Sequence, residues 1–199
     1  MTQDARRTRT RNALLESAAR GLSRYGYGNL VLERVAAEAG YTRGALYHLF
    51  RSKEDLALAV VAWVNETWME EVGGLVDEET EPLAALLALA RGHAVYCRRD
   101  VASVRMTLVA EFGGQDHPVG RAVENVMDAF IERCARLITA ARTAGSVPSG
   151  APPKTLARAY VGALEGLVIQ LAGQAPYDQQ LAERVARGLL GVEDARWVA

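Results

Sequence analysis

Cysteine is scarce in this sequence, which argues against a cysteine-ligated metal site. The 199 residues include only Cys97 and Cys134, and these two lack the paired spacing of zinc ligands. We expect both thiols to be reduced and to pack inside helices as small hydrophobic groups. The sequence therefore predicts no bound metal.

Long apolar runs and strand-like patterns are also missing. No signal peptide and no stretch of about 18 consecutive apolar residues occurs, so no membrane span is predicted. β-branched residues do not alternate with a period of two, so we expect few or no strands. With 50% hydrophobic but only 7% aromatic residues, the composition favours an all-α globular protein. Because no signal peptide and no long apolar run occurs, we expect the protein to be cytoplasmic.

The sequence lacks the usual signatures of an enzyme. None of its three histidines has a glutamate three residues before it, the pairing that metal-dependent helical bundles use. A glycine-rich phosphate loop and a nucleophile elbow are also absent. A helical-bundle enzyme is therefore disfavoured, and we expect no catalytic residues and no cofactor.

Charge is distributed unevenly, although the formal net charge is only -1. Residues 1–53 carry 10 Arg and Lys against 4 Asp and Glu, whereas the remainder carries 13 against 20. The basic segment indicates either a polyanionic partner for this part of the chain or a solvated basic tail. Charge alone leaves these two interpretations open.

Apolar residues recur at helical spacing along most of the chain, and Gly, Pro or capping residues separate the segments. The pattern predicts about nine helices, preceded by a frayed stretch at residues 1–10. Gly73 and Gly74 are expected to end the fourth helix. The expected helices span about 10–25, 32–39, 43–50, 53–72, 81–98, 101–112, 118–143, 153–173 and 178–190.

The segment from Leu30 to Leu56 has the pattern of a helix-turn-helix. A helical apolar pattern ends at Ala39-Gly40, a tight turn follows, and a second short helix begins near Arg43. In this motif one helix braces the next, which enters the DNA major groove. We therefore divide the chain into a three-helix DNA-binding head at 1–53 and a larger helical body at 54–199.

The expected reading helix has one face that can be buried and one that can reach DNA. Leu46 and Phe50, four residues apart, can brace it against the first two helices. Gly44 lets the backbone approach the duplex closely, and Arg43 can bond a guanine edge or a phosphate. The residues expected to face outward are Arg43, Gly44, Tyr47 and His48.

Further basic residues can add phosphate contacts. Lys53 begins the fourth helix, where backbone amides and a positive charge together suit a phosphate. Arg34 is either an exposed helix residue or a phosphate contact, and the two interpretations have equal weight. Nonspecific contacts that salt weakens are expected from Arg6, Arg7, Arg9 and Arg11.

Residues 10–57 resemble the DNA-binding head of the TetR-type (tetracycline-repressor-like, TetR/AcrR) transcriptional regulators. The matching positions are Tyr25-Gly26, Val35-Ala36, Ala39-Gly40, Thr42, Gly44, Leu46-Tyr47, Phe50, Lys53 and Leu56. The resemblance implies a homodimeric repressor that leaves a palindromic double-stranded DNA operator when a small-molecule effector binds the helical body. It also implies DNA contacts by Thr42, Arg43, Tyr47 and Lys53.

Three positions depart from the family's pattern. Val31 stands where Ser or Thr usually caps the second helix, so a cap and a phosphate contact are lost, and Asn29 is the candidate to cap instead. Leu49 stands where His or Tyr is usual, which puts a polar DNA contact there in question. Tyr41 stands where a small aliphatic residue is usual.

The last two helices favour dimerisation. The 153–173 helix is apolar nearly all round, so it should be buried, and its small residues would let another helix come close. TetR-type proteins pair their last two helices across a two-fold axis, and an intramolecular core helix is the alternative. The small residues are Ala159, Gly162, Ala163 and Gly166.

The middle helices are expected to enclose the effector pocket, and the long fourth helix to link that pocket to Lys53. Each candidate lining residue also fits an ordinary core position. The candidates are Trp63, Tyr96, Met106, Phe112, Met127, Phe130 and Glu165, with His93 and Glu111 as further polar contacts.

A second functional hypothesis keeps DNA binding but removes the small-molecule ligand. In this version a protein partner or the redox state controls the regulator, and Cys97 and Cys134 would carry the redox response. Operator binding measured in reductant and in oxidant distinguishes the two hypotheses.

Overall fold

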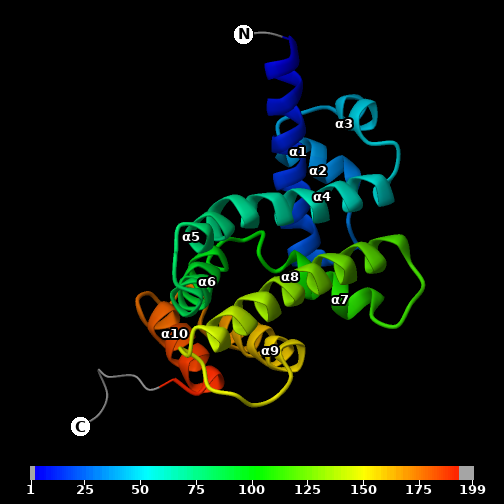
Figure 1. Cartoon of the computed structure of the whole chain (residues 1–199). Helices are drawn as coiled ribbons and strands as arrows, with labels where there is room; N and C mark the ends of the chain where they lie inside the picture. Colours follow the sequence, from blue (N-terminus) through cyan, green and yellow to red (C-terminus); the bar gives the residue numbers. More distant parts are fainter. Residues whose placement is uncertain (1–2, 193–199) are drawn as a thin grey trace. The chain divides into compact units, whose positions relative to one another are not determined.

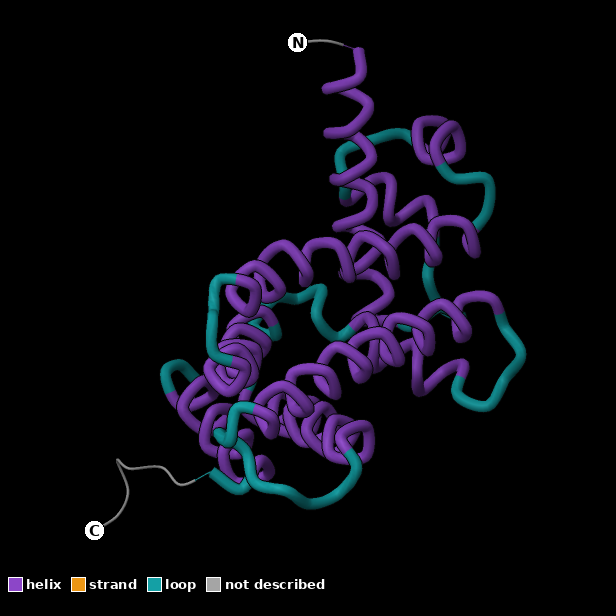
Figure 2. The backbone as a smooth tube through the Cα atoms, in the orientation of Figure 1, coloured by secondary structure: helices purple, strands orange, loops and turns teal. Residues whose placement is uncertain are grey.

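The computed structural model describes residues 3–192, and all regular structure in that range is helical (Figures 1 and 2). The all-α prediction is confirmed. The helices are α1 (Gln3–Tyr25), α2 (Leu32–Glu38), α3 (Arg43–Leu49), α4 (Lys53–Trp68), the π-helical η1 (Met69–Gly73), α5 (Gly74–Asp77), α6 (Pro82–Tyr96), α7 (Val104–Phe112), α8 (Pro118–Thr143), α9 (Pro153–Leu171) and α10 (Tyr177–Leu190).

The helix that begins at Lys53 does not end at Gly73-Gly74, so that prediction is wrong. It passes through η1 into α5 and ends at Asp77. Glycine disfavours a helix by about 1 kcal/mol relative to alanine, but the flanking Val72 and Val76 are buried and offset that cost. Counted as one helix, residues 53–77 bring the described chain to the nine helices expected.

The described chain forms two compact units. The first unit contains residues up to 67 together with 100–126, and the second contains 68–99 and the described residues from 127 onward. The predicted boundary at residue 53 does not coincide with this division, because α7 and the start of α8 belong to the same unit as the helix-turn-helix. The functional division into head and body stays a prediction.

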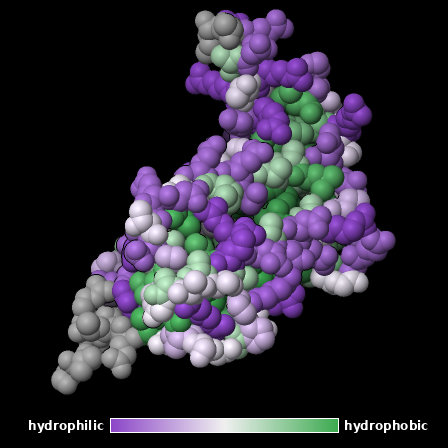
Figure 3. Space-filling model, viewed as in Figure 1, coloured by the Kyte–Doolittle hydropathy of each residue, from purple (hydrophilic) through white to green (hydrophobic). Residues whose placement is uncertain are grey.

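In the first unit, α1 supplies the central apolar face. Leu14, Leu15 and Leu22 are fully buried in a core that also takes residues from α2, α3, α4, α7 and α8. The prediction that residues 1–10 are frayed is wrong for residues 3–10, which are helical; residues 1–2 lie outside the described range. Figure 3 shows the first turns of α1 as largely hydrophilic surface.

In the second unit, α6 is the core element. Its residues from Ala85 to Ala90 are all buried, and α9 and α10 both contact it. Tyr160 of α9 is fully buried and its hydroxyl donates to the carbonyl of Leu86, so the phenol is anchored inside the core. Burial also raises the pKa of Cys134 to about 12.

The helix predicted to be buried at residues 153–173 is partly exposed in the single chain, as is the helix that follows it. Ile169 of α9 is 59% exposed, and Tyr177 and Leu181 of α10 are 63% and 37% exposed. A Cβ added at Gly162 or Gly166 would meet no atom within 4 Å. One side of each of the last two helices therefore lies open.

Candidate nucleic-acid interface

The start of α2 lacks a side-chain cap, as the sequence predicts. Val31 occupies the N-cap position and makes no capping hydrogen bond. Asn29 does not substitute for it, contrary to expectation, because its Nδ2 donates to the Tyr25 carbonyl at the end of α1, at 3.2 Å. The first amides of α2 thus have no partner from either side chain.

The turn between α2 and α3 is sharply defined by hydrogen bonds. Gly40 adopts a φ of +77°, which glycine tolerates best. The N–H groups of Gly40 and Tyr41 donate to the carbonyls of Ala37 and Ala36, the pattern that ends many helices. Thr42 then caps α3, because its Oγ1 accepts the Ala45 N–H at 3.2 Å, as predicted.

The two faces of α3 differ as the sequence predicts. Leu46 is fully buried and Phe50 is 3% exposed, and both belong to the core that includes Leu14, Val35 and Ala36. The residues that remain exposed are Thr42, Arg43, Gly44, Tyr47 and His48. The core holds one side of this short helix in place and leaves the other side available for a partner.

Arg43 makes two weak contacts within the chain. Its Nε lies 3.1 Å from Glu33 Oε1, with both side chains more than half exposed, and its guanidinium lies 5.2 Å from the centroid of the Tyr47 ring. An exposed ion pair of this kind contributes about 0–1 kcal/mol. Arg43 can therefore exchange these contacts for a base edge or a phosphate. Arg34 is exposed and lies over the ring of Tyr25.

Lys53 lies at the start of α4 but is held by the α1–α2 turn. Its Nζ donates to the Gly28 carbonyl at 2.8 Å and lies 4.8 Å from the centroid of the Tyr27 ring. Ser52 caps α4 by accepting the Asp55 N–H at 3.0 Å, as predicted. Sequence reasoning missed the contact between Lys53 and this turn, since spacing within a helix says nothing about a loop 25 residues earlier.

The seven predicted pocket residues are divided between the two units, and a shared pocket stays a prediction. Trp63, Met106 and Phe112 belong to the first unit, whereas Tyr96, Met127, Phe130 and Glu165 belong to the second. Phe112 is buried and stacks on the ring of His117, with 4.1 Å between centroids. Glu111, a further candidate, instead binds the backbone of the α1–α2 turn.

Two of the predicted residues, Glu165 and Phe130, lie beside the buried His93 in the second unit. Glu165 Oε1 lies 3.4 Å from His93 Nε2, and Trp68 Nε1 donates to Nδ1 at 3.2 Å. Burial by itself lowers the pKa of His93, but Cys97 and Glu165 outweigh it and raise that pKa to about 9. The indole N–H can only donate, so its bond to Nδ1 requires that nitrogen to be unprotonated.

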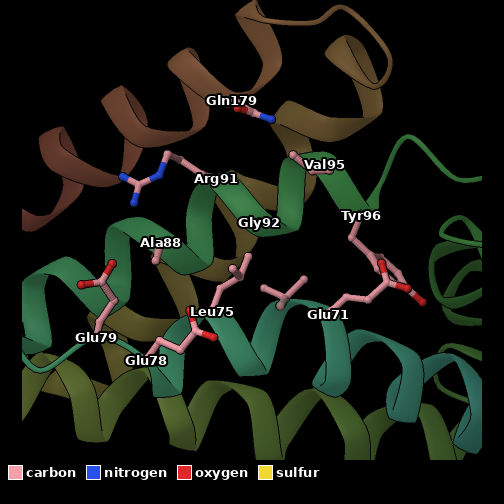
Figure 4. Close-up of a pocket in the computed structure, with 11 residues that line it drawn as sticks. Glu71, Leu75, Glu78, Glu79, Ala88, Arg91, Gly92, Val95, Tyr96 and Gln179 are labelled. Atoms are coloured by element: carbon pink, nitrogen blue, oxygen red, sulfur yellow. The ribbon is translucent and has the colours of Figure 1, made fainter.

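A hollow of about 340 Å³ opens between α5, α6 and the start of α10 in the second unit (Figure 4). Val72 and Ala88 contribute an apolar floor, and Tyr96 is the one predicted pocket residue among its lining. Charged and polar side chains also line it: Glu71, Glu78, Glu79, Arg91 and Gln179. Its lining contains three carboxylates and one guanidinium; Glu71 pairs with Arg99, and Arg91 pairs with Glu183.

Residues 3–192 include no helix that is both long and apolar enough to cross a membrane. The same described range contains no group of three or more His, Cys, Asp or Glu side chains placed to hold a metal ion.

Comparison with known proteins finds a family match for the helix-turn-helix segment. Residues 14–60 match the family described as "Bacterial regulatory proteins, tetR family". Over 180 residues the chain is 28% identical to the A-factor receptor protein of Streptomyces griseus, a match that covers 88% of this chain. It spans only 59% of the receptor's own length.

Solved structures share the fold. SCO4454, a TetR-family transcriptional regulator from Streptomyces coelicolor, matches with a TM-score of 0.75 and 22% identity over 92% of this chain and 95% of that one. AibR, solved in complex with isovaleryl coenzyme A and operator DNA, matches with a TM-score of 0.72 and 20% identity over 92% of this chain and 100% of that one. The family match thus covers the helix-turn-helix formed by α2 and α3. The solved structures show that the fold is shared over most of the chain.

Proposed function

We propose that this protein is a DNA-binding transcriptional regulator, without enzymatic activity, whose α3 enters the major groove of an operator. The observation that carries the proposal is the two-sided character of α3. Its inner residues Leu46 and Phe50 are buried, while Arg43, Tyr47 and His48 are exposed. A reading helix needs both properties, a rigid brace and a free polar face.

The exposed residues divide by what they can reach. Arg43, in the first turn of α3, can make a bidentate contact with guanine O6 and N7. Gly44 places no side chain between the backbone and the duplex. Thr42, Tyr47 and His48 have hydroxyl or ring N–H groups for phosphates or base edges, and Arg34 and Lys53 carry charges for phosphates.

We also propose a homodimer that forms through α9 and α10. The open sides of these helices combine small residues, Gly162 and Gly166, with the exposed apolar side chains Ile169, Tyr177 and Leu181. Glycine allows two helices to approach closely, and apolar surface of this kind favours association. A two-fold dimer would present two α3 helices to a palindromic site.

The regulator is proposed to be a repressor that a small molecule releases from its operator. The hollow beside α6 supports a ligand with an apolar part and a positive charge, because it has an apolar floor and three carboxylates. Arg99 of the chain itself shows how a cation can bind here. Its guanidinium pairs with Glu71 and lies 5.4 Å from the Tyr96 ring centroid. Control by a protein partner or by oxidation of Cys97 is the alternative.

The central test is selection of random double-stranded DNA by the purified protein. We expect an enriched palindrome with half-sites about one helical turn, ~10 base pairs, apart. Enrichment of no sequence would overturn the proposed DNA-binding function.

The recovered duplex then allows effector candidates to be titrated, with small organic amines tested against neutral and acidic compounds of similar size. If tight binders leave operator affinity unchanged, ligand control is wrong, and repeating the assay in reductant and oxidant tests the redox alternative.

A further inference from the structure

The turn between α1 and α2 is held by a carboxylate from a distant helix. Glu111, in the last turn of α7, accepts the Tyr27 N–H through Oε2 and the Gly28 N–H through Oε1, each at 2.6 Å. Both oxygens are thus used on consecutive backbone amides, 84 and 83 residues away along the chain. Hydrogen bonds from amides to a charged carboxylate are among the stronger bonds in proteins.

The two glycines in this turn make room for the carboxylate. Gly26 has a φ of +75°, and a Cβ there would lie 2.8 Å from Glu111 Oε2. A Cβ on Gly28 would lie 3.1 Å from Oε1. Successive N–H groups that point into one concavity form a natural anion site, and here that site is filled by a side chain of the same unit.

The same turn positions Lys53. Gly28 accepts a hydrogen bond from Lys53 Nζ through its carbonyl while its N–H is bound by Glu111. Tyr27, the other residue held by Glu111, places its ring 4.8 Å from the same ammonium group. Lys53 has three N–H donors, so one bond to Gly28 still leaves donors for a phosphate.

Aromatic packing joins the end of α7 to this turn a second time. The rings of Tyr27 and Phe112, the residue after Glu111, pack in a T-shaped arrangement with 5.2 Å between centroids. The α1–α2 turn is therefore bound to α7 by the carboxylate of Glu111 and by the ring of Phe112.

We propose that Glu111 is a positioning residue for DNA binding: it fixes the α1–α2 turn, and through Gly28 it fixes the ammonium group of Lys53 where a phosphate is to be bound. The inference rests on the proposed function. It assigns α7 a direct influence on the head, since any change at the end of α7 alters the order of a phosphate-binding lysine. Glu111 itself need not touch DNA.

A double-mutant cycle tests this mechanism. Glu111→Gln keeps the size of the side chain, but its amide NH2 group would face a backbone N–H and lose at least one of the two bonds. We expect Glu111→Gln to weaken operator binding by about 3–10-fold, the range for ordering one long side chain. In the Lys53→Ala background the same change should have no further effect.

A matched control removes the same charge elsewhere. Glu124 is exposed on α8 within the same unit, and Glu124→Gln should leave operator affinity unchanged or slightly stronger, since it removes a negative charge from a DNA-binding protein. Glu111→Gln removes an equal charge, so a loss of affinity in that variant cannot come from net charge.

Gly28→Ala provides an uncharged version if Glu111→Gln fails to fold. The new Cβ would press on Oε1 of Glu111, and we expect the same loss of affinity, again only when Lys53 is present. Equal losses with and without Lys53, or no loss in either variant, would overturn the positioning role while wild-type operator binding still stands. A wild-type protein that selects no duplex would instead remove the proposed function itself.

Discussion

The contacts of Arg43 within the free protein are weak, so its guanidinium can leave them to bind DNA. Its partners, Glu33 and Tyr47, both lie at the surface, where water and salt compete for the guanidinium. Leaving them therefore costs little. Lys53 differs, because its bond to the Gly28 carbonyl fixes the ammonium before any phosphate binds.

Arg43→Ala should cost about 1–3 kcal/mol of operator binding and relax sequence preference at one base pair, if Arg43 reads a guanine. Affinity for the selected operator and for each single-base variant, measured by anisotropy, checks this. Arg20→Ala is the matched control, since Arg20 is an arginine already paired with Glu16 within α1. Equal affinities for all base variants with wild-type protein would argue for a phosphate contact instead.

Lys53→Ala should weaken all duplexes alike and reduce the slope of log affinity against log salt by about 1, because one phosphate contact is lost. Binding isotherms at four or more salt concentrations give that slope. A loss confined to one sequence would mean that Lys53 reads a base.

At the scale of helices, the bracing of α3 decides whether the outer face is usable. Leu46 is fully buried and belongs to the first unit's core, whereas His48 on the other face is exposed. Substitutions on the two faces of α3 should therefore affect different quantities. A change at Leu46 should lower stability, and a change at His48 should alter DNA binding.

Leu46→Ala should lower the free energy of unfolding by about 2–5 kcal/mol, the usual cost of truncating a buried leucine. His48→Ala should leave unfolding within about 0.5 kcal/mol of wild type and affect only operator affinity. Urea unfolding followed by circular dichroism measures both. Similar destabilisation by the two variants would mean that α3 is not oriented as described.

Helix positions were largely predictable because glycine, proline and capping residues punctuate this chain. Pro118 and Pro153 start α8 and α9 where expected, and Thr42 caps α3. There are two exceptions: α1 begins at Gln3, and the helix from Lys53 continues through Gly73-Gly74, where packing overrides local preference.

Contacts between helices could not be read in the same way. The bonds from Glu111 to the α1–α2 turn join residues more than 80 positions apart, and periodicity within one helix does not say which helix it meets. For the same reason the predicted pocket residues fall into two units. A helical pattern identifies a buried face but not its neighbour.

At the scale of the whole molecule, the open sides of α9 and α10 determine the proposed assembly. Ile169 is the most exposed large aliphatic side chain on α9, and in a folded monomer it would remain in water. A second copy of the chain would bury it together with Tyr177 and Leu181.

Ile169→Glu should therefore yield a folded monomer that binds a palindromic operator more weakly, because a charge buried at an apolar interface is strongly unfavourable. Sedimentation velocity gives the oligomeric state and circular dichroism the fold. Val109→Glu, a change at another exposed aliphatic residue on α7, is the control and should leave the oligomeric state unaltered. Wild-type protein that sediments as a monomer would remove the basis for this prediction.

The indole of Trp68 gives the second unit an optical reporter. Its N–H can bond to His93 only while the imidazole is neutral, and the pKa of His93 is raised to about 9. Protonation breaks this bond, but Cys97 and Glu165 favour the charged imidazole. Their contribution to stability is complete below the ordinary pKa of about 6.5 and disappears as the pH rises through about 9. In a variant that keeps Trp68 as the sole tryptophan (W63F, W197F), emission should change over that alkaline interval, since a charged imidazole quenches a neighbouring indole. The transition should vanish in His93→Gln, and any ligand that disturbs this cluster would become visible by fluorescence without a label.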